Sequence, residues 1–241
     1  MSGLAVSNLT FSYGAKTALD GVSFDINPGR FCALLGPNGA GKSTLFGLLT
    51  RLLNTSQGHI QIAGHDLTQH PRAALAKLGI VFQQTTLDLD LSVHQNLSYF
   101  AALHGISGRD AKVRIDRALD RLGMLERAGE KARTLNGGHR RRTEIARALL
   151  HGPEVLLLDE ATVGLDAAAR ADITNHVHQL CDEGITVLWA THLTDEVQDK
   201  DDLVILHNAK VLAQGITRDI RATASLKDTF LELTAATAPP A

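Results

Sequence analysis

The stretch Gly36-Pro-Asn-Gly-Ala-Gly-Lys-Ser-Thr44 decides the fold, because it fits the pattern G-x-x-x-x-G-K-[S/T]. It follows an apolar run at 31–35 that is typical of a strand buried on both faces, and it precedes apolar residues at helical spacing over 45–53. In this context the glycines let backbone N–H groups curl around phosphate oxygens at the positive end of the helix. We therefore expect Lys42 to reach the β- and γ-phosphates of a nucleotide and Ser43 to ligate Mg²⁺.

A pair of acidic residues follows a second buried run. The apolar residues at 155–158 are followed directly by Asp159 and Glu160. Because α/β sheets bind ligands at the carboxyl ends of their parallel strands, we expect Asp159 to hold Mg²⁺. Glu160 is expected to polarise an attacking water as a general base.

The remaining periodicity predicts an α/β core with an insertion. Strict alternation at 22–26 and further short runs make the first sixty residues β-rich, whereas residues 85–150 are helical. Buried runs then return at 155–158, 185–190 and 203–206, with a helical segment at 166–181 between the first two. This alternation of strands and helices predicts βαβ units and a parallel sheet.

Composition excludes several classes of protein. Of the 241 residues, 44% are apolar and 21% are charged, which excludes a disordered chain. The formal net charge of −2 argues against a nucleic-acid binder that relies on bulk charge. The two cysteines, Cys32 and Cys181, form no disulfide framework, so we expect a reducing compartment and interpret both as buried small hydrophobic residues.

The sequence also predicts a cytoplasmic location. The longest candidate for a membrane span is the stretch 91–108, which contains no Lys, Arg, Asp or Glu. It is interrupted by polar residues, so it does not predict a membrane span. The N-terminus has no basic region followed by an apolar core, so no signal peptide is expected.

A third motif, Leu135-Asn-Gly-Gly-His139, lies upstream of the acidic pair. With it, the chain resembles the nucleotide-binding subunit of an ATP-binding cassette (ABC) transporter over nearly its whole length. The family signature is usually Leu-Ser-Gly-Gly-Gln and completes the ATP site of a second subunit; here Asn136 replaces the serine and His139 the glutamine. Gly137 and Gly138 can open a helix with N–H groups facing an anion, and the Asn136 amide can both cap that helix and donate to phosphate.

The resemblance implies roles for further residues. Tyr13 resembles the aromatic residue that stacks on adenine. Gln83 resembles the glutamine that contacts Mg²⁺ or the lytic water, with Gln84 as the less favoured choice. Asp166 lies in a stretch that resembles the loop crossing the dimer interface, and His192 resembles the histidine that contacts the γ-phosphate.

The motifs and the resemblance together give three sets of expected site residues. The catalytic set is Lys42, Gln83, Glu160 and His192. The Mg²⁺ set is Ser43, Gln83 and Asp159. The nucleotide contacts are Tyr13, Gly36, Pro37, Asn38, Gly39, Ala40, Gly41, Lys42, Ser43, Thr44, Asn136, Gly137, Gly138, His139 and Asp166.

Two further features of the sequence directly follow these motifs. Ala161 occupies a position where the family commonly has proline, which would stiffen the turn that carries Glu160. Arg140, Arg141 and Arg142 lie in the first turn after the signature, where cations oppose the helix dipole. They form either a solvated basic face or a source of positive potential toward the partner's nucleotide or the membrane subunit.

The implied fold is an α/β P-loop NTPase with a RecA-like core, an N-terminal antiparallel β subdomain and an inserted α-helical subdomain. We expect a single ABC ATPase domain over residues 1–234. Its parts are a core at 1–84 and 150–215, a helical insertion at 85–149 and a short C-terminal extension at 216–234, followed by a disordered tail at 235–241.

The resemblance implies an ATPase that converts ATP and water to ADP and phosphate, with ATP and Mg²⁺ as cofactors. Two copies would close on two ATP molecules, each held between Lys42 of one copy and Gly137 and Gly138 of the other, and hydrolysis would reopen the dimer. The expected partners are a second ATPase subunit and a membrane (permease) subunit docked near residues 83–100, and no nucleic acid is expected. Such a subunit is peripheral on the cytoplasmic face of the plasma membrane. The transported substrate, and whether the second subunit is identical, stay open.

The C-terminal segment 226–234 resembles those of ATPase subunits of ABC-2-type exporters, which favours export. More narrowly, stretches at 135–142, 176–178 and 187–192 resemble ATPases associated with pyrroloquinoline quinone-dependent alcohol dehydrogenase systems. The main alternative is a soluble ABC ATPase without a permease, in cluster assembly, translation or DNA metabolism. A P-loop kinase conflicts with the signature and with Glu160, because a kinase must keep water from attacking.

Overall fold

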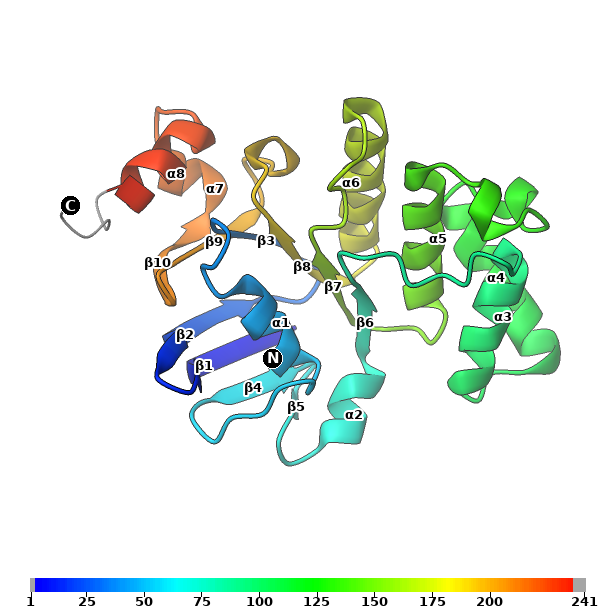
Figure 1. The fold of residues 1–241 in the computed structure, drawn as a ribbon, viewed down its shortest axis with the longest axis horizontal. Coiled ribbons are helices and arrows are strands. Elements are labelled where there is room, and N and C mark those ends of the chain that lie inside the picture. Colours follow the sequence, from blue (N-terminus) through cyan, green and yellow to red (C-terminus); the bar gives the residue numbers. More distant parts are fainter. Residues whose placement is uncertain (1–2, 236–241) are drawn as a thin grey trace.

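Residues 3–235, which the computed structural model describes, fold around two β-sheets (Figure 1). The larger sheet has the strand order β10-β9-β3-β8-β7-β6, and every neighbouring pair from β9 to β6 is parallel. Its strands are β3 (Phe31–Leu35), β6 (Leu78–Val81), β7 (Val155–Asp159), β8 (Thr186–Thr191), β9 (Asp202–His207) and β10 (Lys210–Ile216).

The smaller sheet is antiparallel, with the order β2-β1-β4-β5. It consists of β1 (Leu4–Tyr13), β2 (Lys16–Ile26), β4 (His59–Ile62) and β5 (His65–Asp66). The first two strands form a long hairpin whose register runs from Leu4 opposite Ile26 to Tyr13 opposite Lys16. Tyr13 therefore lies at the tip of this hairpin, at the end of β1.

The central strands of the larger sheet are buried on both faces. In β3, Phe31, Ala33 and Leu35 contribute to one hydrophobic core, whereas Cys32 and Leu34 contribute to the other. The same alternation holds in β7 and β8, because successive side chains of a strand point to opposite faces. One core lies against the smaller sheet and α1 (Lys42–Leu49), and the other lies against α5 (Gly137–Leu149) and α6 (Ala167–Asp182).

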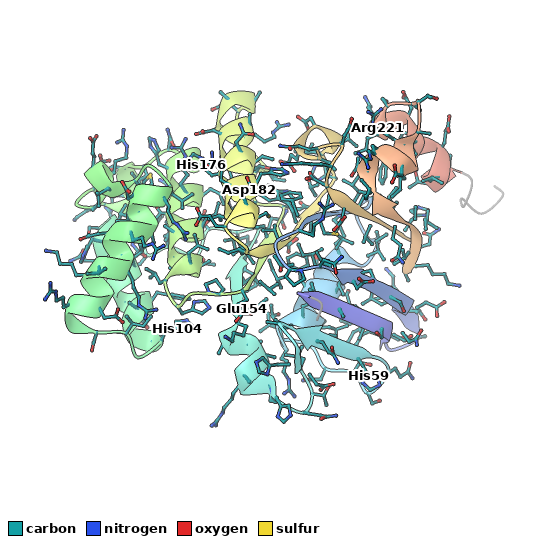
Figure 2. All side chains as sticks on the ribbon, turned by 180° about the vertical axis from the view of Figure 1, so that it is seen from behind. His59, His104, Glu154, His176, Asp182 and Arg221 are labelled. Carbon is teal, nitrogen blue, oxygen red and sulfur yellow. The ribbon has the colours of Figure 1, made fainter. Side chains whose placement is uncertain are left out.

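Three helices gather at one end of the molecule, beyond β6 and β7: α3 (Val93–Leu103), α4 (Gly108–Arg121) and α5 (Figure 1). The helices α7 (Thr217–Arg221) and α8 (Leu226–Ala235) lie at the opposite end. His104, just after α3, and Arg221 mark these two ends, with His176 and Asp182 of α6 between them (Figure 2). The short helix α2 (Pro71–Ala76) connects the two sheets, and single 3-10 turns occur at Leu125–Arg127, Ala132–Thr134 and Thr194–Glu196. Among residues 3–235, no helix combines the length and the apolar character that crossing a membrane requires.

The predicted fold class is confirmed: the chain is α/β, with an antiparallel β portion near its start and helices in its middle. Both cysteines are buried, as predicted. The helix after the glycine-rich loop ends at Leu49, earlier than the apolar spacing indicates, and Leu52 is 71% exposed. The edge strand β10 was not predicted, because its side chains are mostly half-buried and show no continuous apolar run. Ala235, expected in the tail, is the last residue of α8, and 236–241 lie outside the described residues.

Candidate functional site

The glycine-rich loop connects β3 to α1 and requires glycine at both of its ends, Gly36 and Gly41. A Cβ on Gly41 would lie 2.5 Å from the carbonyl oxygen of Ala18, and one on Gly36 would lie 2.5 Å from that of Leu206. Gly41 also has φ +114°, a conformation that other residues rarely adopt. No side chain caps the first turn of α1, so its N–H groups face the loop and can bind an anion.

The carboxylate of Glu160 is the point at which the predicted catalytic residues meet. Gln83 donates its side-chain N–H to Glu160 Oε2 at 2.9 Å. Lys42 Nζ lies 3.6 Å and His192 Nδ1 lies 3.5 Å from Glu160 Oε1. Four side chains from positions far apart in the sequence are therefore grouped at the carboxyl ends of β3, β6, β7 and β8. Among residues 3–235, the glutamine side chain that hydrogen-bonds to Glu160 is that of Gln83 and not that of Gln84.

Two ionisable groups in this cluster have shifted pKa values. Burial lowers the pKa of Lys42, whereas the negative charge of Glu160 opposes that shift. Burial raises the pKa of Asp159, and the neighbouring Glu160 raises it further. Lys42 also donates to the carbonyl oxygens of Gly36 at 2.6 Å and Pro37 at 3.3 Å. The ammonium group is therefore held between the loop and the two carboxylates.

A cleft of about 470 Å³ opens beside this cluster. It is lined by the glycine-rich loop, by Gln83 and Glu160, and by Tyr13 at the hairpin end of the smaller sheet. Tyr13 is 53% exposed and packs edge-to-face on Phe11, with the ring centroids 4.9 Å apart. The cleft therefore combines backbone donors, the ammonium groups of Lys16 and Lys42 and an exposed aromatic ring, which are groups that a nucleoside triphosphate can bind.

Most of the other predicted loop residues lie at this cleft. Pro37, Asn38, Gly39, Gly41, Ser43 and Thr44 contribute to its lining. Ala40 is different, because its side chain is buried in the core beneath the loop. Asp159 ends β7 opposite Ala190 and precedes Glu160.

The signature residues lie at a different place. Asn136 caps α5 by accepting the N–H of His139 at 2.8 Å. Asp166 caps α6 in the same way, through the N–H of Ala169 at 2.9 Å. The two helix starts are neighbours, because a Cβ on Gly137 would lie 2.9 Å from Leu165 Cδ2. Within residues 3–235, neither helix start lines the cleft, so the signature and the cleft lie at separate places on the chain.

The arginines after the signature do not form the solvated face that was one of the two expectations. Arg140 donates to the carbonyl oxygens of Ala132 and Arg133, and Arg142 pairs with Asp172 on α6. Arg141 is buried and donates to the backbone of the Gln83 loop. Its pairing partner Glu144 lies three residues further along α5, a spacing that could have indicated an ion pair from the sequence.

Sequence reasoning also missed Glu196. This carboxylate is 2% exposed and accepts hydrogen bonds from Thr162 Oγ1, Thr191 Oγ1 and Trp189 Nε1, the last at 3.0 Å. Thr162 follows Glu160 by two residues, and Thr191 directly precedes His192. Glu196 therefore connects, through hydrogen bonds, the segment that carries Glu160 with the segment that carries His192.

Comparisons with known proteins agree with this geometry. The family model described as "ABC transporter" matches residues 19–163. The linearmycin resistance ATP-binding protein LnrL of Bacillus subtilis (strain 168) is 36% identical over 232 residues, which cover 96% of this chain and 74% of that protein. The Nod factor export ATP-binding protein I of Ralstonia nicotianae (strain ATCC BAA-1114 / GMI1000) is 36% identical over 213 residues, which cover 88% of this chain and 66% of that protein.

A solved structure, cbiO1 from Clostridium perfringens, described as part of the ABC transporter complex cbiONQ, is similar to this chain with a TM-score of 0.85 and 30% identity. The match covers 98% of this chain and 96% of that chain. The predicted family, ATPase activity and transporter role are thereby confirmed, in preference to a non-transport ATPase. The resemblance to systems associated with pyrroloquinoline quinone stays a prediction. The chain belongs to the ABC transporter family, as an ATP-binding subunit that hydrolyses ATP.

Proposed function

We propose that this chain dimerises on ATP and that its hydrolysis of ATP drives export through a separate membrane subunit. The observation that carries the proposal is the meeting of Lys42, Gln83 and His192 on the carboxylate of Glu160, beside a cleft that the signature does not reach. The hydrolytic groups belong to one chain, while the contact that completes the site is supplied by a second copy.

In the proposed mechanism, the phosphates bind the N–H groups of the glycine-rich loop, and Lys42 balances their charge. Tyr13 packs against the adenine. Glu160 accepts a proton from the water that attacks the γ-phosphorus, so that ADP leaves and phosphate forms. Gln83 orients this water, and His192 contacts the γ-phosphate.

The residues around the cleft fit a magnesium ion. Ser43, Asp159 and Gln83 offer a hydroxyl, a carboxylate and an amide oxygen, which are the hard oxygen donors that Mg²⁺ prefers. The Gln83 amide donates its N–H to Glu160, which leaves its oxygen as the acceptor for a cation. When bound, the ion would neutralise phosphate charge that Lys42 alone does not balance.

Dimerisation would place Asn136 of one copy against the nucleotide of the other. Its side-chain oxygen already caps α5, so its NH₂ group is the part that can donate to phosphate. Asn136→Asp keeps the cap but replaces this donor with a negative charge. We expect the Asp variant to stay folded and to lose the ATP-dependent dimer that size-exclusion chromatography with light scattering detects in a Glu160→Gln background. A dimer of undiminished stability would contradict this contact.

The proposed docking site for the membrane subunit lies between the Gln83 loop and α3. A groove of about 400 Å³ is lined there by Thr86, Tyr99, Phe100 and Arg147 among others. Tyr99 and Leu103 on α3 are each 65% exposed, and large exposed apolar side chains in a cluster mark interaction surfaces. This position would let a segment of the membrane subunit contact the glutamine loop, which is the loop that contains Gln83.

We also propose the subdivision into core, helical insertion and C-terminal extension, because α3 to α5 are grouped together beyond the sheet (Figure 1).

Export is the proposed direction, because one relative is named for Nod factor export and another for resistance to linearmycin. The chain would then lie at the cytoplasmic face of the membrane, held by its permease. The test is capture of tagged Glu160→Gln protein from detergent-solubilised native membranes with ATP and Mg²⁺, followed by mass spectrometry. We expect a stoichiometric polytopic membrane protein, which Tyr99→Ser with Leu103→Ser should lose while ATP binding persists. Recovery of ribosomes, DNA or cluster-assembly factors alone would contradict the proposal.

A further inference from the structure

Helix α5 carries three charged side chains that face the loop containing Gln83. They are Arg141, Glu144 and Arg147, spaced three residues apart, so they follow one another along the same side of the helix. Arg141 is 6% and Glu144 is 1% exposed. Charged side chains are rarely buried to this degree unless they are paired and hydrogen-bonded.

Arg141 holds the backbone of the glutamine loop directly. Its Nη1 donates to the carbonyl oxygen of Phe82 at 2.6 Å, and its Nη2 donates to that of Gln83 at 2.7 Å. The planar guanidinium group can span two consecutive carbonyl oxygens because its donors have a fixed fork geometry. Glu144 Oε2 accepts a third hydrogen bond from Nη1 at 2.9 Å and balances the buried charge.

The second half of the same loop is held by the other two residues. Glu144 Oε1 accepts the backbone N–H of Thr86 at 2.6 Å and its hydroxyl at 3.2 Å. Arg147 donates to the carbonyl oxygen of Thr86 at 3.0 Å and to its hydroxyl. The loop from Phe82 to Thr86 is therefore fixed at both ends to one face of α5.

These contacts connect the signature with the cleft. The start of α5 carries Asn136, and its middle holds the backbone of Gln83, whose side chain donates to Glu160 at 2.9 Å. We propose that Arg141 is a positioning residue, which holds Gln83 against Glu160 and so links the placement of α5 to hydrolysis in the chain's own cleft. The inference rests on the proposed role of Gln83 at the hydrolytic site.

The test compares Arg141→Met, Gln83→Ala and the double variant in steady-state and single-turnover ATP hydrolysis. Loss of the hydrogen bonds from a charged donor should lower kcat by ~10- to 100-fold in Arg141→Met. The KM for ATP should change little, because the glycine-rich loop and Lys42 are untouched. Arg114→Met is the matched control: Arg114 also donates to a backbone carbonyl oxygen, that of Leu150 at 3.4 Å, but on α4 and away from the glutamine loop.

The double variant separates positioning from a general structural role. If Arg141 acts through Gln83, then Arg141→Met should lower kcat by less than about twofold when Gln83 is already alanine. A full additional loss in the double variant would overturn the inference. So would an unchanged kcat in a folded Arg141→Met protein while Gln83→Ala lowers it, and that result would leave the proposed function intact.

A further outcome distinguishes failure of the proposed function itself. If Gln83→Ala hydrolyses ATP at the normal rate, then Gln83 has no role at the site, and both the role and its positioning are overturned. Far-ultraviolet circular dichroism verifies folding of each variant. If Arg141→Met does not fold, Arg141→Lys is used, whose single ammonium group can hold one of the two carbonyl oxygens and should give a smaller fall in kcat.

Discussion

Replacing Glu196 by alanine would remove the acceptor of three buried donors. The indole N–H of Trp189 can only donate, and the hydroxyl groups of Thr162 and Thr191 are enclosed with it. A buried donor left without a partner costs about 1–3 kcal/mol. We expect Glu196→Ala to lower the free energy of unfolding by about 3 kcal/mol or more, since at least the indole and one hydroxyl cannot find new partners. This is a large part of the ~5–15 kcal/mol that stabilises a typical domain.

Two further variants identify the cause. Glu196→Gln keeps one acceptor oxygen for Trp189 and Thr191, and the hydroxyl of Thr162 can accept from the new NH₂ group, so we expect a loss of less than about half of that in the alanine variant. Glu154→Ala removes a surface carboxylate that is 56% exposed and pairs with Lys77, and should cost at most ~1 kcal/mol. The contrast separates a buried acceptor from a surface charge.

The assay is equilibrium unfolding in urea followed by far-ultraviolet circular dichroism. Fluorescence of Trp189, the one tryptophan in the sequence, is unsuitable as the main signal because Glu196 contacts its indole directly. The slope of the transition should be unchanged, so that the midpoint reports stability. The reasoning is refuted if the alanine variant unfolds within about 1 kcal/mol of the parent protein, or if the glutamine variant is equally unstable.

Three other variants address the cleft. Glu160→Gln should still bind ATP but release phosphate about 10²–10⁴-fold more slowly in a single turnover, and a near-normal rate would exclude Glu160 as the base. Lys42→Ala should lose binding of a fluorescent ATP analogue at equilibrium; retained affinity would contradict its contact with phosphate. Burial and Glu160 raise the pKa of Asp159, so the folded state binds this proton more tightly than the unfolded state and the ionised carboxylate lowers stability at neutral pH. Asp159→Asn should therefore raise Tm at pH 7 without nucleotide, and this gain should shrink as the pH falls through the raised pKa. The same variant should lose Mg²⁺-dependent hydrolysis. An unchanged or lowered Tm at pH 7 would contradict the predicted effect on stability.

Local patterns in the sequence predicted the parts of the site that depend on local backbone structure. The glycine-rich loop can be recognised because Gly36 and Gly41 must approach other backbone atoms closely, and only glycine allows this. Asp159 and Glu160 could be placed because a continuous apolar strand precedes them and ends where parallel sheets bind ligands. The antiparallel β portion followed from alternation with a period of two.

The contacts that hold the site together left little signal in the sequence. Arg141 and Phe82 are 59 residues apart, and Glu196 and Thr162 are 34 residues apart. No periodic pattern connects such positions, because their proximity arises from the order of strands in the sheet. A run of three arginines indicates a basic surface when it is considered alone, and only the packing of α5 against the glutamine loop shows that the middle one is buried.

The contacts around Glu160 show what restricts the backbone of its turn, although Ala161 stands where the family commonly has proline. Glu160 has φ +46°, a left-handed conformation that costs a residue with a side chain about 1–2 kcal/mol. This conformation persists only if the surrounding structure enforces it. The N–H of Glu160 donates to Ala190 at 2.9 Å, which continues the pairing of β7 with β8, and Ala161 is completely buried.

One residue later, the hydroxyl of Thr162 is bound by Glu196. The turn is thus fixed by a hydrogen bond before Ala161, by burial of Ala161 itself and by a hydrogen bond after it. A proline ring would restrict the same backbone by limiting one φ angle. Here the restriction is distributed over tertiary contacts, so the orientation of the Glu160 carboxylate toward Lys42 depends on the integrity of the core beneath the site rather than on a stiff residue in the turn.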